Sequence, residues 1–436
     1  MNKYQKAIKN ASWIVACRVV QSLISLLIGM IAARYLGPAN YGLLGYANSI
    51  VAFAVPLAKL GFNHIIVEEL VSFPENEGKT LGTTLCLSCL SGILCICGCL
   101  SFVSITNPGE NDTLLVCGLY SISIFFEITE MIQHWFHAKL ISKYVSISSL
   151  VSYLFVSVYK VYLLATGKSV FWFAASYALD YLIISVILFI VYKKLNGQRL
   201  SFSLKLGKKM FAKSKHYILP SMMLTIVSQT DRIMIKQLVG NVENGYYSTA
   251  VTCAGITGFV FMAIIDSLRP LVFESKKENV NKYKNNIALL YSLIIYLGLA
   301  QSLILTIFSY PIVSILYGQA YLPAAPILRI ITWYITFSYM GNVRNIWMLS
   351  EGKQKYLLIV NMSGVVINIS LNALLIPKFG AMGAAIASVI TQFFANVGMC
   401  FIVRPLRPVL NIISYALNPK FIINSINSIC KKGLRR

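Results

Sequence analysis

Charged residues are scarce in this chain of 436 residues, and acidic residues are the scarcest. Only 12% of the residues are Asp, Glu, Lys or Arg, whereas a typical soluble domain holds roughly 25%. Hydrophobic residues make up 57% of the chain, and the mean hydropathy is +0.69. This balance excludes a soluble enzyme, a disordered chain and a coiled coil, and it predicts a polytopic membrane protein.

Histidine is also rare, with four residues, which limits metal chemistry. Cys86 and Cys89 have the spacing of zinc ligands, but a zinc site needs a second pair of ligands in an accessible setting. Five of the ten cysteines lie in one apolar run with no histidine nearby: Cys86, Cys89, Cys95, Cys97 and Cys99. We therefore expect these cysteines to pack helices, and we predict neither a metal nor a cofactor.

Long apolar runs are abundant, and a bilayer-spanning helix needs about 20 mostly apolar residues. The expected fold is all-α, and no cleavable signal peptide is expected, because the basic N-terminal segment leads into an apolar run longer than a signal h-region. Twelve candidate spans lie at about 10–33, 42–62, 81–104, 113–135, 144–165, 169–192, 217–238, 246–268, 287–309, 325–349, 356–377 and 381–403.

The net charge of +23 follows from 38 Lys and Arg against 15 Asp and Glu. With the N-terminus placed inside, 28 of the 38 cations fall in inner segments, and six lie in spans or at their ends. The outer loops hold only four, which are Arg34, Lys168, Lys236 and Lys378. The positive-inside rule then predicts that both termini are cytoplasmic. Membrane topology thereby explains the excess of cations, and nucleic acid is not an expected partner.

Two similarities within the chain recur at almost half its length. Gly37 and Gly42 align with Gly240 and Gly245 at an offset of 203, between the first two spans and between the seventh and eighth. Trp135 and Tyr144 align in the same way with Trp347 and Tyr356, at an offset of 212. These matches predict two parallel six-helix lobes, like those of transporters that move two lobes about a central site.

The predicted organisation therefore has four parts. Residues 1–192 form an N-lobe, 193–216 a basic cytoplasmic linker, 217–403 a C-lobe, and 404–436 a basic cytoplasmic tail. The linker mixes lysines with apolar residues such as Phe202, Leu204 and Phe211. This mixture predicts an interfacial segment that lies on anionic membrane lipids.

Four segments resemble one known family: Ala33–Gly42, Thr230–Ile235 with Gly245–Ala250, Leu316–Tyr321 with Pro326–Arg329, and Asn368–Ser388. They are similar to Wzx-type flippases of O-antigen and capsular polysaccharide repeat units, in the MATE-like multidrug/oligosaccharidyl-lipid/polysaccharide exporter superfamily. The resemblance implies two six-helix lobes around a central cavity. It also implies that a polyprenyl-diphosphate-linked oligosaccharide moves from the inner to the outer leaflet of a bacterial cytoplasmic membrane, with a polysaccharide polymerase and chain-length proteins as partners. Some superfamily members have fourteen helices, so a count of twelve argues against the lipid II flippase branch.

A diphosphate cargo calls for cations within the spans, where ionisable residues are costly and normally face the bundle interior. Arg18 on the first span and Arg232 on the seventh are the leading candidates, because a planar guanidinium matches phosphate oxygens. The alternative for both is a structural ion pair with Glu127, Glu130 or Asp231. Lys160, Arg329 and Arg344 are further candidates. The alternative for Lys160 is snorkelling to the outer surface, and the alternative for Arg329 is placement on the surface. The alternative for Arg344 is anchoring at the inner headgroups.

Intramembrane carboxylates are candidates for coupling transport to H⁺ or Na⁺. Glu127 and Glu130 lie one turn apart in the fourth span, Asp180 lies in the sixth, and Asp231 precedes Arg232. A buried carboxylate has a raised proton affinity. The alternative is that these carboxylates neutralise Arg18 and Lys160 within a resting lobe.

Three rival functions remain open from the sequence. A drug or metabolite exporter of the same superfamily would bind organic cations, whereas the first span carries Arg18 and no carboxylate. A membrane glycan polymerase or ligase would need catalytic groups outside, yet the longest outer loop, at about 310–324, has no charged residue and no His. A scaffold in a polysaccharide assembly complex is the third rival. We therefore expect a flippase and not an enzyme.

Overall fold

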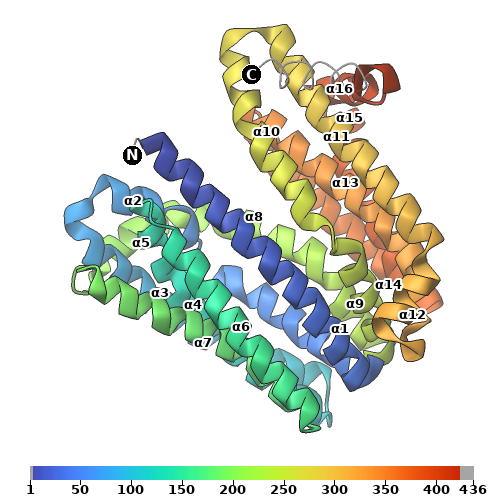
Figure 1. The fold of residues 1–436 in the computed structure, drawn as a ribbon, viewed down its shortest axis with the longest axis horizontal. Helices are drawn as coiled ribbons and strands as arrows, with labels where there is room; N and C mark the ends of the chain where they lie inside the picture. The colour runs from blue at the N-terminus through green and yellow to red at the C-terminus, as the bar shows by residue number, and fades with distance from the viewer. Residues whose placement is uncertain (1–2, 423–436) are drawn as a thin grey trace. The chain divides into compact units, whose positions relative to one another are not determined.

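The computed structural model describes the backbone of residues 3–422 and the side chains of residues 20–22 and 24–422. Within this part of the chain the structure is almost entirely helical and contains no strand. The chain divides into two compact units, 1–245 and 246–436 (Figure 1). The predicted all-α fold is confirmed, and the four-part division into lobes, linker and tail stays a prediction.

Unit 1 is built from eight α-helices with short 3₁₀ turns between some of them, and a ninth helix crosses into unit 2. The bounds are α1 Lys3–Ala58, α2 Ile66–Ser72, α3 Glu77–Thr106, α4 Asn111–Thr129, α5 Gln133–Ala138, α6 Lys143–Ala165, α7 Val170–Lys194, α8 Leu204–Leu238 and α9 Asn241–Gly255. A 3₁₀ turn at Glu130–Ile132 separates α4 from α5.

Unit 2 continues from α9 with helices α10 to α16. Their bounds are α10 Gly258–Glu278, α11 Val280–Ile307, α12 Ser309–Tyr317, α13 Ala324–Ser350, α14 Leu357–Phe393, α15 Met399–Ile402 and α16 Pro408–Ala416. A π-helical segment, Phe394–Gly398, joins α14 to α15.

Seven helical segments of the described chain are long and apolar enough to cross a membrane, and the bent pair α9 and α10 makes an eighth. Two of these segments each contain two predicted spans, because α1 is kinked at Gly37 and α14 at Gly380. Helices α8 and α13 lie at the remaining predicted spans but are more polar. The protein is thus a multi-pass membrane protein, and the count of twelve spans stays a prediction.

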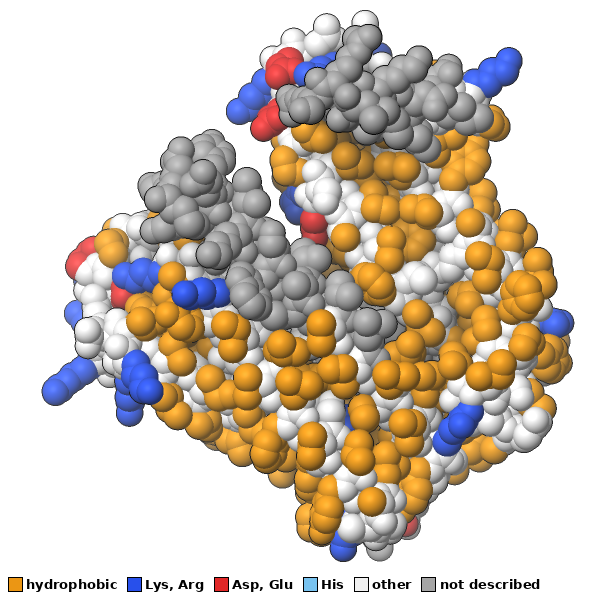
Figure 2. Space-filling model, in the orientation of Figure 1, with side chains coloured by type: hydrophobic (Ala, Val, Ile, Leu, Met, Phe, Trp, Pro, Cys, Tyr) orange, Lys and Arg blue, Asp and Glu red, His pale blue; other side chains and the backbone are white. Residues whose placement is uncertain are grey.

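The surface agrees with a membrane location. Hydrophobic side chains cover much of the face that Figure 2 shows, and visible Lys, Arg, Asp and Glu side chains are few there. Long hydrophobic residues that a soluble protein would bury are exposed along the spans, including Leu94 at 68% and Ile105 at 78%. Lipid tails solvate such side chains as well as a protein interior does.

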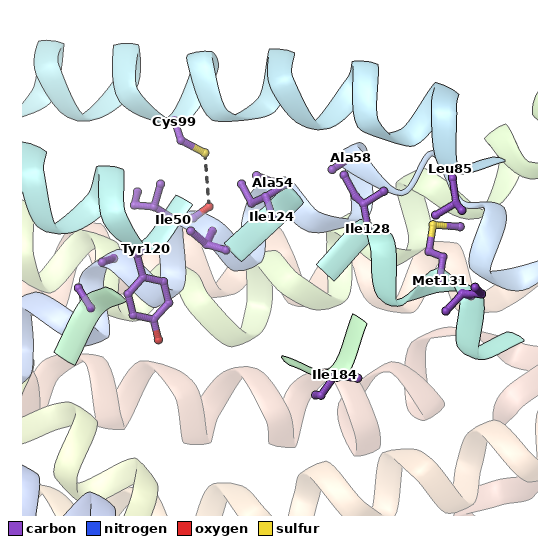
Figure 3. Close-up of a cluster of buried hydrophobic side chains, with 14 of the residues drawn as sticks. Ile50, Ala54, Ala58, Leu85, Cys99, Tyr120, Ile124, Ile128, Met131 and Ile184 are labelled. Atoms are coloured by element: carbon purple, nitrogen blue, oxygen red, sulfur yellow. Dashed lines mark hydrogen bonds between the residues drawn. The ribbon is translucent and has the colours of Figure 1, made fainter. Parts of the chain in front are cut away.

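The core of unit 1 forms where α1, α3, α4 and α7 pack together (Figure 3). Small residues on α1, such as Ala54 and Ala58, admit the branched side chains of Ile124 and Ile128 from α4. Cys99 on α3 is a buried free thiol whose sulfur lies 4.0 Å from the Ile50 carbonyl oxygen. Cys99 therefore packs helices, as expected from the sequence.

The segment between α7 and α8 is hydrogen-bonded along the start of α3. The Gly78 amide donates to Gln198 Oε1 over 3.0 Å, and the Ser201 amide donates to the Gly78 carbonyl over 3.1 Å. The Ser203 amide then donates to Thr83 Oγ1 over 3.0 Å. The predicted linker thus has a fixed path on unit 1, while Phe202 on it stays 52% exposed, as an interfacial segment requires.

The first repeat match marks two equivalent turns. Gly37 has φ 72° and Gly240 has φ 113°, and each separates two consecutive helical segments. Only glycine adopts this left-handed region without strain. The offset of 203 residues found in the sequence therefore joins two glycines that both have positive φ.

These two turns bring equivalent segments of unit 1 into reciprocal contact. A Cβ atom on Gly42 would collide with the Asn241 carbonyl oxygen, and a Cβ atom on Gly245 would collide with the Pro38 carbonyl oxygen. The Asn244 amide also donates to the Gly42 carbonyl over 2.7 Å. Because Pro38 and Asn241 are themselves 203 residues apart, the contact is close to symmetric, and it requires glycine on both sides.

We predict that Gly42→Ala destabilises the protein by about 1–3 kcal/mol, the usual range for overpacking against a rigid neighbour. The measurement is the melting temperature of the purified protein in detergent. Gly98→Ala on α3 is the matched control, because nothing lies within 4 Å of a Cβ atom there. Equal melting temperatures for the two variants would contradict the close contact.

Candidate functional site

A charge cluster lies within unit 1 and consists of Lys59, Glu127, Glu130, Lys160 and Asp180. Lys59 directly follows α1, and its Nζ lies 2.7 Å from Glu127 Oε1 on α4. The two side chains are only 17% and 15% exposed. Among the described side chains, Lys59 is therefore the direct ion-pair partner of Glu127.

Asp180 on α7 and Lys160 on α6 form the other part of the charge cluster. Ser152 Oγ donates to Asp180 Oδ1 over 2.5 Å and to the Asp180 carbonyl over 2.8 Å. Lys160 is half-buried and lies close enough to Asp180 for their charges to interact. The Lys160 side chain thus lies near a carboxylate of its own unit, as the neutralising alternative required.

Glu130 is the carboxylate of the charge cluster that has no direct partner. The carboxylate of Glu130 forms no hydrogen bond or ion pair with any described residue, although the residue is half-buried. Lys59, Glu127 and Asp180 all lie within electrostatic range of it. Glu130 also begins the 3₁₀ turn after α4, and 3₁₀ stretches within a helix often mark functional positions.

Tyrosines of α4 and α7 lie beside the charge cluster. Tyr177 and Tyr181 lie near both Glu127 and Glu130, and their rings are 5.5 Å apart. Tyr177 also stacks on Tyr120 at 4.2 Å between ring centroids. The charge cluster is therefore bordered by the phenol rings of Tyr120, Tyr177 and Tyr181, which we call the tyrosine border. These rings supply hydroxyl groups without adding charge.

Helix α8 contributes a polar face that reaches the tyrosine border. Gln229 Oε1 accepts hydrogen bonds from Arg232 Nη1 over 3.1 Å and from the buried Ser49 Oγ over 2.9 Å. The Arg232 guanidinium lies within electrostatic range of Tyr120. Arg232 thus lies near the same tyrosine border as the charge cluster, whereas the adjacent Asp231 is 2% exposed and has bonding partners of its own.

One turn further along α8, Lys236 ties this helix to the segment between α3 and α4. Its Nζ lies 2.6 Å from both Asn107 Oδ1 and Glu110 Oε2, and its side chain is 5% exposed. The sequence placed Lys236 in an outer loop. The structure buries it instead, because Glu110 and Asn107 supply the oxygen ligands that an ammonium needs away from water.

In unit 2, the two candidate arginines have different surroundings. Arg344 is 2% exposed, and its Nη1 donates to the Ala395 carbonyl in the π-helical segment over 2.6 Å. Arg329 is exposed, donates from Nε to Ser309 Oγ over 2.8 Å, and covers the Tyr310 ring at 4.8 Å. Arg344 is therefore bonded to the backbone rather than placed at headgroups, and Arg329 lies at the surface.

Two residues show the limits of the sequence prediction. The side chain of Arg18 lies outside the described residues. Lys59 is a site residue that the sequence analysis did not single out, because a lysine at the inner end of a span has the pattern of an ordinary positive-inside charge. Its signal was its position three residues after Pro56, inside an otherwise apolar run.

An apolar groove of about 570 Å³ lies in unit 1 between α1, α3 and α8. Ile50 and Leu57 line it from α1, Leu94 and Gly98 from α3, and Ile233 from α8. Thr230 is one of its few polar lining residues. This groove is large and apolar enough to hold part of a hydrocarbon chain.

Comparison with known proteins relates the chain to polysaccharide biosynthesis proteins. The family model "Polysaccharide biosynthesis protein" matches residues 7–276. The capsular polysaccharide biosynthesis protein CapF of Staphylococcus aureus is 22% identical over 402 residues, covering 89% of this chain and 97% of CapF. An uncharacterized membrane protein of Methanocaldococcus jannaschii is 28% identical over 233 residues, which cover 50% of this chain but only 45% of that relative.

Solved structures share the fold. The lipid II flippase MurJ in an inward closed conformation matches with a TM-score of 0.66 and 16% identity, covering 97% of this chain and 99% of MurJ. An inward-facing multidrug resistance MATE family transporter matches with a TM-score of 0.65 and 12% identity, covering 89% and 96%. The resemblance to MATE-like polysaccharide flippases that the sequence motifs indicated is confirmed.

We predict that Glu110→Gln lowers the melting temperature at pH 7. The hydrogen bond from Lys236 lowers the pKa of Glu110 below its ordinary value, so the ionised carboxylate stabilises the fold. Since Glu110 is half-exposed, we expect a loss of about 1 kcal/mol, or about 2–4 °C. This stabilisation is present above the ordinary carboxyl pKa and disappears as the pH falls through the lowered one.

The difference between the Glu110→Gln variant and the unmodified protein should therefore vanish in acid. Glu278→Gln is the control, because Glu278 pairs with Lys282 one turn away and both side chains are more than half exposed. We expect the control variant to have the same melting temperature as the unmodified protein at every pH. A melting temperature of Glu110→Gln that is unchanged at pH 7 would show that Asn107 alone satisfies Lys236.

Proposed function

Because the chain belongs to the polysaccharide biosynthesis protein family, we propose that it is a flippase for a polyprenyl-diphosphate-linked oligosaccharide repeat unit. It moves this lipid from the inner to the outer leaflet of a bacterial cytoplasmic membrane, for surface polysaccharide synthesis, with both of its termini in the cytoplasm. The CapF relative and the MurJ fold support this proposal. A polysaccharide polymerase and chain-length proteins are the proposed partners.

One observation carries the proposal: α8 serves two chemically different surfaces of unit 1. Thr230 and Ile233 line the apolar groove, while Gln229 and Arg232 take part in the polar contacts beside the tyrosine border. A lipid-linked glycan has the same two parts, an isoprenoid tail and a dianionic diphosphate. The groove suits the tail, and the polar face of α8 suits the diphosphate.

Arg232, Lys160 and Arg18 are the proposed diphosphate ligands. The Arg232 guanidinium donates a hydrogen bond to the neutral amide of Gln229, and its planar fork matches phosphate oxygens. Arg18 remains a proposal from its position in the first span. The bonds of Arg329 and Arg344 favour surface and structural roles, so these two residues weigh less in the proposed site.

Glu130 is the proposed ion-coupling residue, with Glu127 and Asp180 beside it. Three carboxylates and two lysines leave one negative charge of the cluster without a counter-ion among the described side chains, and a proton or Na⁺ would balance it. Asp231 is buried on α8 and weighs less. Binding and release of this cation would then drive alternating access of the two lobes.

A cation-coupled drug or metabolite exporter of the same superfamily is the alternative, since multidrug transporters share the fold. Such an exporter would bind organic cations, whereas the polar face of α8 presents Arg232. A membrane glycan polymerase or ligase is the remote alternative. The relatives and the solved structures favour a transporter over an enzyme.

We predict that the purified protein in proteoliposomes flips a fluorescent polyprenyl-diphosphate oligosaccharide, and that Gly98→Phe slows flipping about tenfold. A phenyl ring at Gly98 would occupy the groove, and nothing within 4 Å of its Cβ atom forces the backbone to move. Flipping is measured as exposure of the fluorescent glycan to a membrane-impermeant quencher. Ile105→Phe on the same helix is the control, because Ile105 is 78% exposed and does not line the groove.

The two outcomes separate the candidate functions. Transport of an organic cation with no flipping would replace the flippase by the exporter. Normal flipping by Gly98→Phe would remove the groove from the mechanism while leaving the function standing.

We also predict that Glu130→Gln removes the response of flipping to an imposed pH or Na⁺ gradient. The amide keeps the shape of the side chain but carries no charge for a cation to balance. The rate of flipping is measured with and without each gradient. Glu68→Gln is the control, because Glu68 is exposed and lies outside the charge cluster. A gradient response that survives in Glu130→Gln would leave the cluster with a purely structural role.

A further inference from the structure

A separate cavity lies within unit 2. Its volume is about 750 Å³, and its walls come from the end of α10, the first residues of α11, the end of α13, and α16. The wall from α11 uses residues between Val280 and Ala288, where the apolar span Val280–Ile307 begins. The cavity therefore lies where a membrane-spanning helix meets the polar boundary, on the side that the charges predict to be cytoplasmic.

The charge of the cavity wall is positive. Lys276, Lys284 and Lys353 line it, against the single carboxylate of Glu351. Lys276 pairs with Glu351, and Lys353 donates to the Pro405 carbonyl over 2.8 Å. Lys284 has no hydrogen bond or ion pair to any described residue, so its ammonium is available to a ligand.

Amides and aromatic rings complete the wall. Asn281, Asn285 and Asn411 line the cavity, and their side-chain amides form no hydrogen bond within the described chain. Lys353 lies over the Trp347 ring at 4.6 Å, and Lys276 lies over the Tyr283 ring at 4.6 Å. These contacts hold two ammonium groups in place, while the free lysine and amides leave donors for an anion with several oxygens.

Two hydrogen bonds hold the wall that α16 contributes to the cavity. α16 is anchored to α11 because Ser292 Oγ donates to the Ala416 carbonyl over 2.7 Å and Tyr296 OH donates to the Leu417 carbonyl over 2.9 Å. Tyr415 at the cavity and the neighbouring Leu417 remain about half exposed. The cavity thus combines fixed cations with exposed apolar side chains at the level of a bilayer surface.

We propose that this cavity binds the phosphate-bearing headgroup of an anionic membrane phospholipid, whose acyl chains remain in the bilayer beside α11. Basic cavities between spans on the cytoplasmic side recognise anionic headgroups in this way. Phosphate oxygens would contact Lys284 and the ordered ammonium of Lys353, and glycerol hydroxyls would contact the asparagine amides. A choline headgroup is disfavoured, because its cation meets lysines and an already paired carboxylate.

The test is native mass spectrometry of the full chain in neutral detergent, titrated with phosphatidylglycerol or phosphatidylcholine. We expect one phosphatidylglycerol to be retained in preference to phosphatidylcholine. Lys284→Gln should weaken its retention about fivefold, the effect of one lysine near an anionic headgroup. Asn285→Phe should weaken retention by filling the cavity at unchanged charge, so the proposal does not depend on one variant.

Lys282→Gln is the matched control, since Lys282 carries the same charge two residues away, pairs with Glu278 and does not line the cavity. Retention by this variant should stay within twofold of the unmodified protein. Equal weakening by Lys282→Gln, or equal retention of the two lipids, would overturn the proposal in favour of diffuse surface attraction. Displacement of phosphatidylglycerol by millimolar inorganic phosphate would overturn it in favour of a free-anion site.

Discussion

Each charged group within apolar helices needs a partner, because an isolated charge away from water is far costlier than a paired one. This constraint organises the interior of the protein. Lys236 joins α8 to the segment between α3 and α4 through Glu110 and Asn107. Lys59 joins the end of α1 to α4 through Glu127. In unit 2, Arg344 holds a carbonyl of the π-helical segment. These charges thus serve as contacts between helices, and Glu130 differs because its carboxylate has no direct partner among the described side chains.

Close backbone contact is the second constraint, and it supports the first. The reciprocal packing of Gly42 and Gly245 brings the start of α9 against α1. Gln229 and Arg232 lie on the helix that precedes this contact, and Ser49 lies on the helical segment that follows Gly42. The glycines therefore help to set the position from which α8 presents its polar residues, so the symmetry of the repeat also serves the candidate site.

Much of the fold could be predicted from the sequence. Apolar runs of about 20 residues located the helices, because bilayer thickness sets their length. The 203-residue offset identified Gly37 and Gly240 as equivalent, and both adopt positive φ. The candidate site was predicted less completely. Glu127, Glu130, Lys160 and Asp180 were chosen as intramembrane charges and lie in one cluster, but Lys59 was missed and Lys236 was placed outside.

The sequence by itself determined that the protein is helical, spans a membrane and is internally repeated, because hydropathy, charge distribution and offset are properties of the linear chain. The tertiary structure decided which charge meets which. The pairing of Glu127 with Lys59, 68 residues earlier in the chain, depends on the depth and rotation of α1 and α4, and packing alone sets these. The lysine and amide cavity of unit 2 has the same origin, since its walls come from α10, α11, α13 and α16.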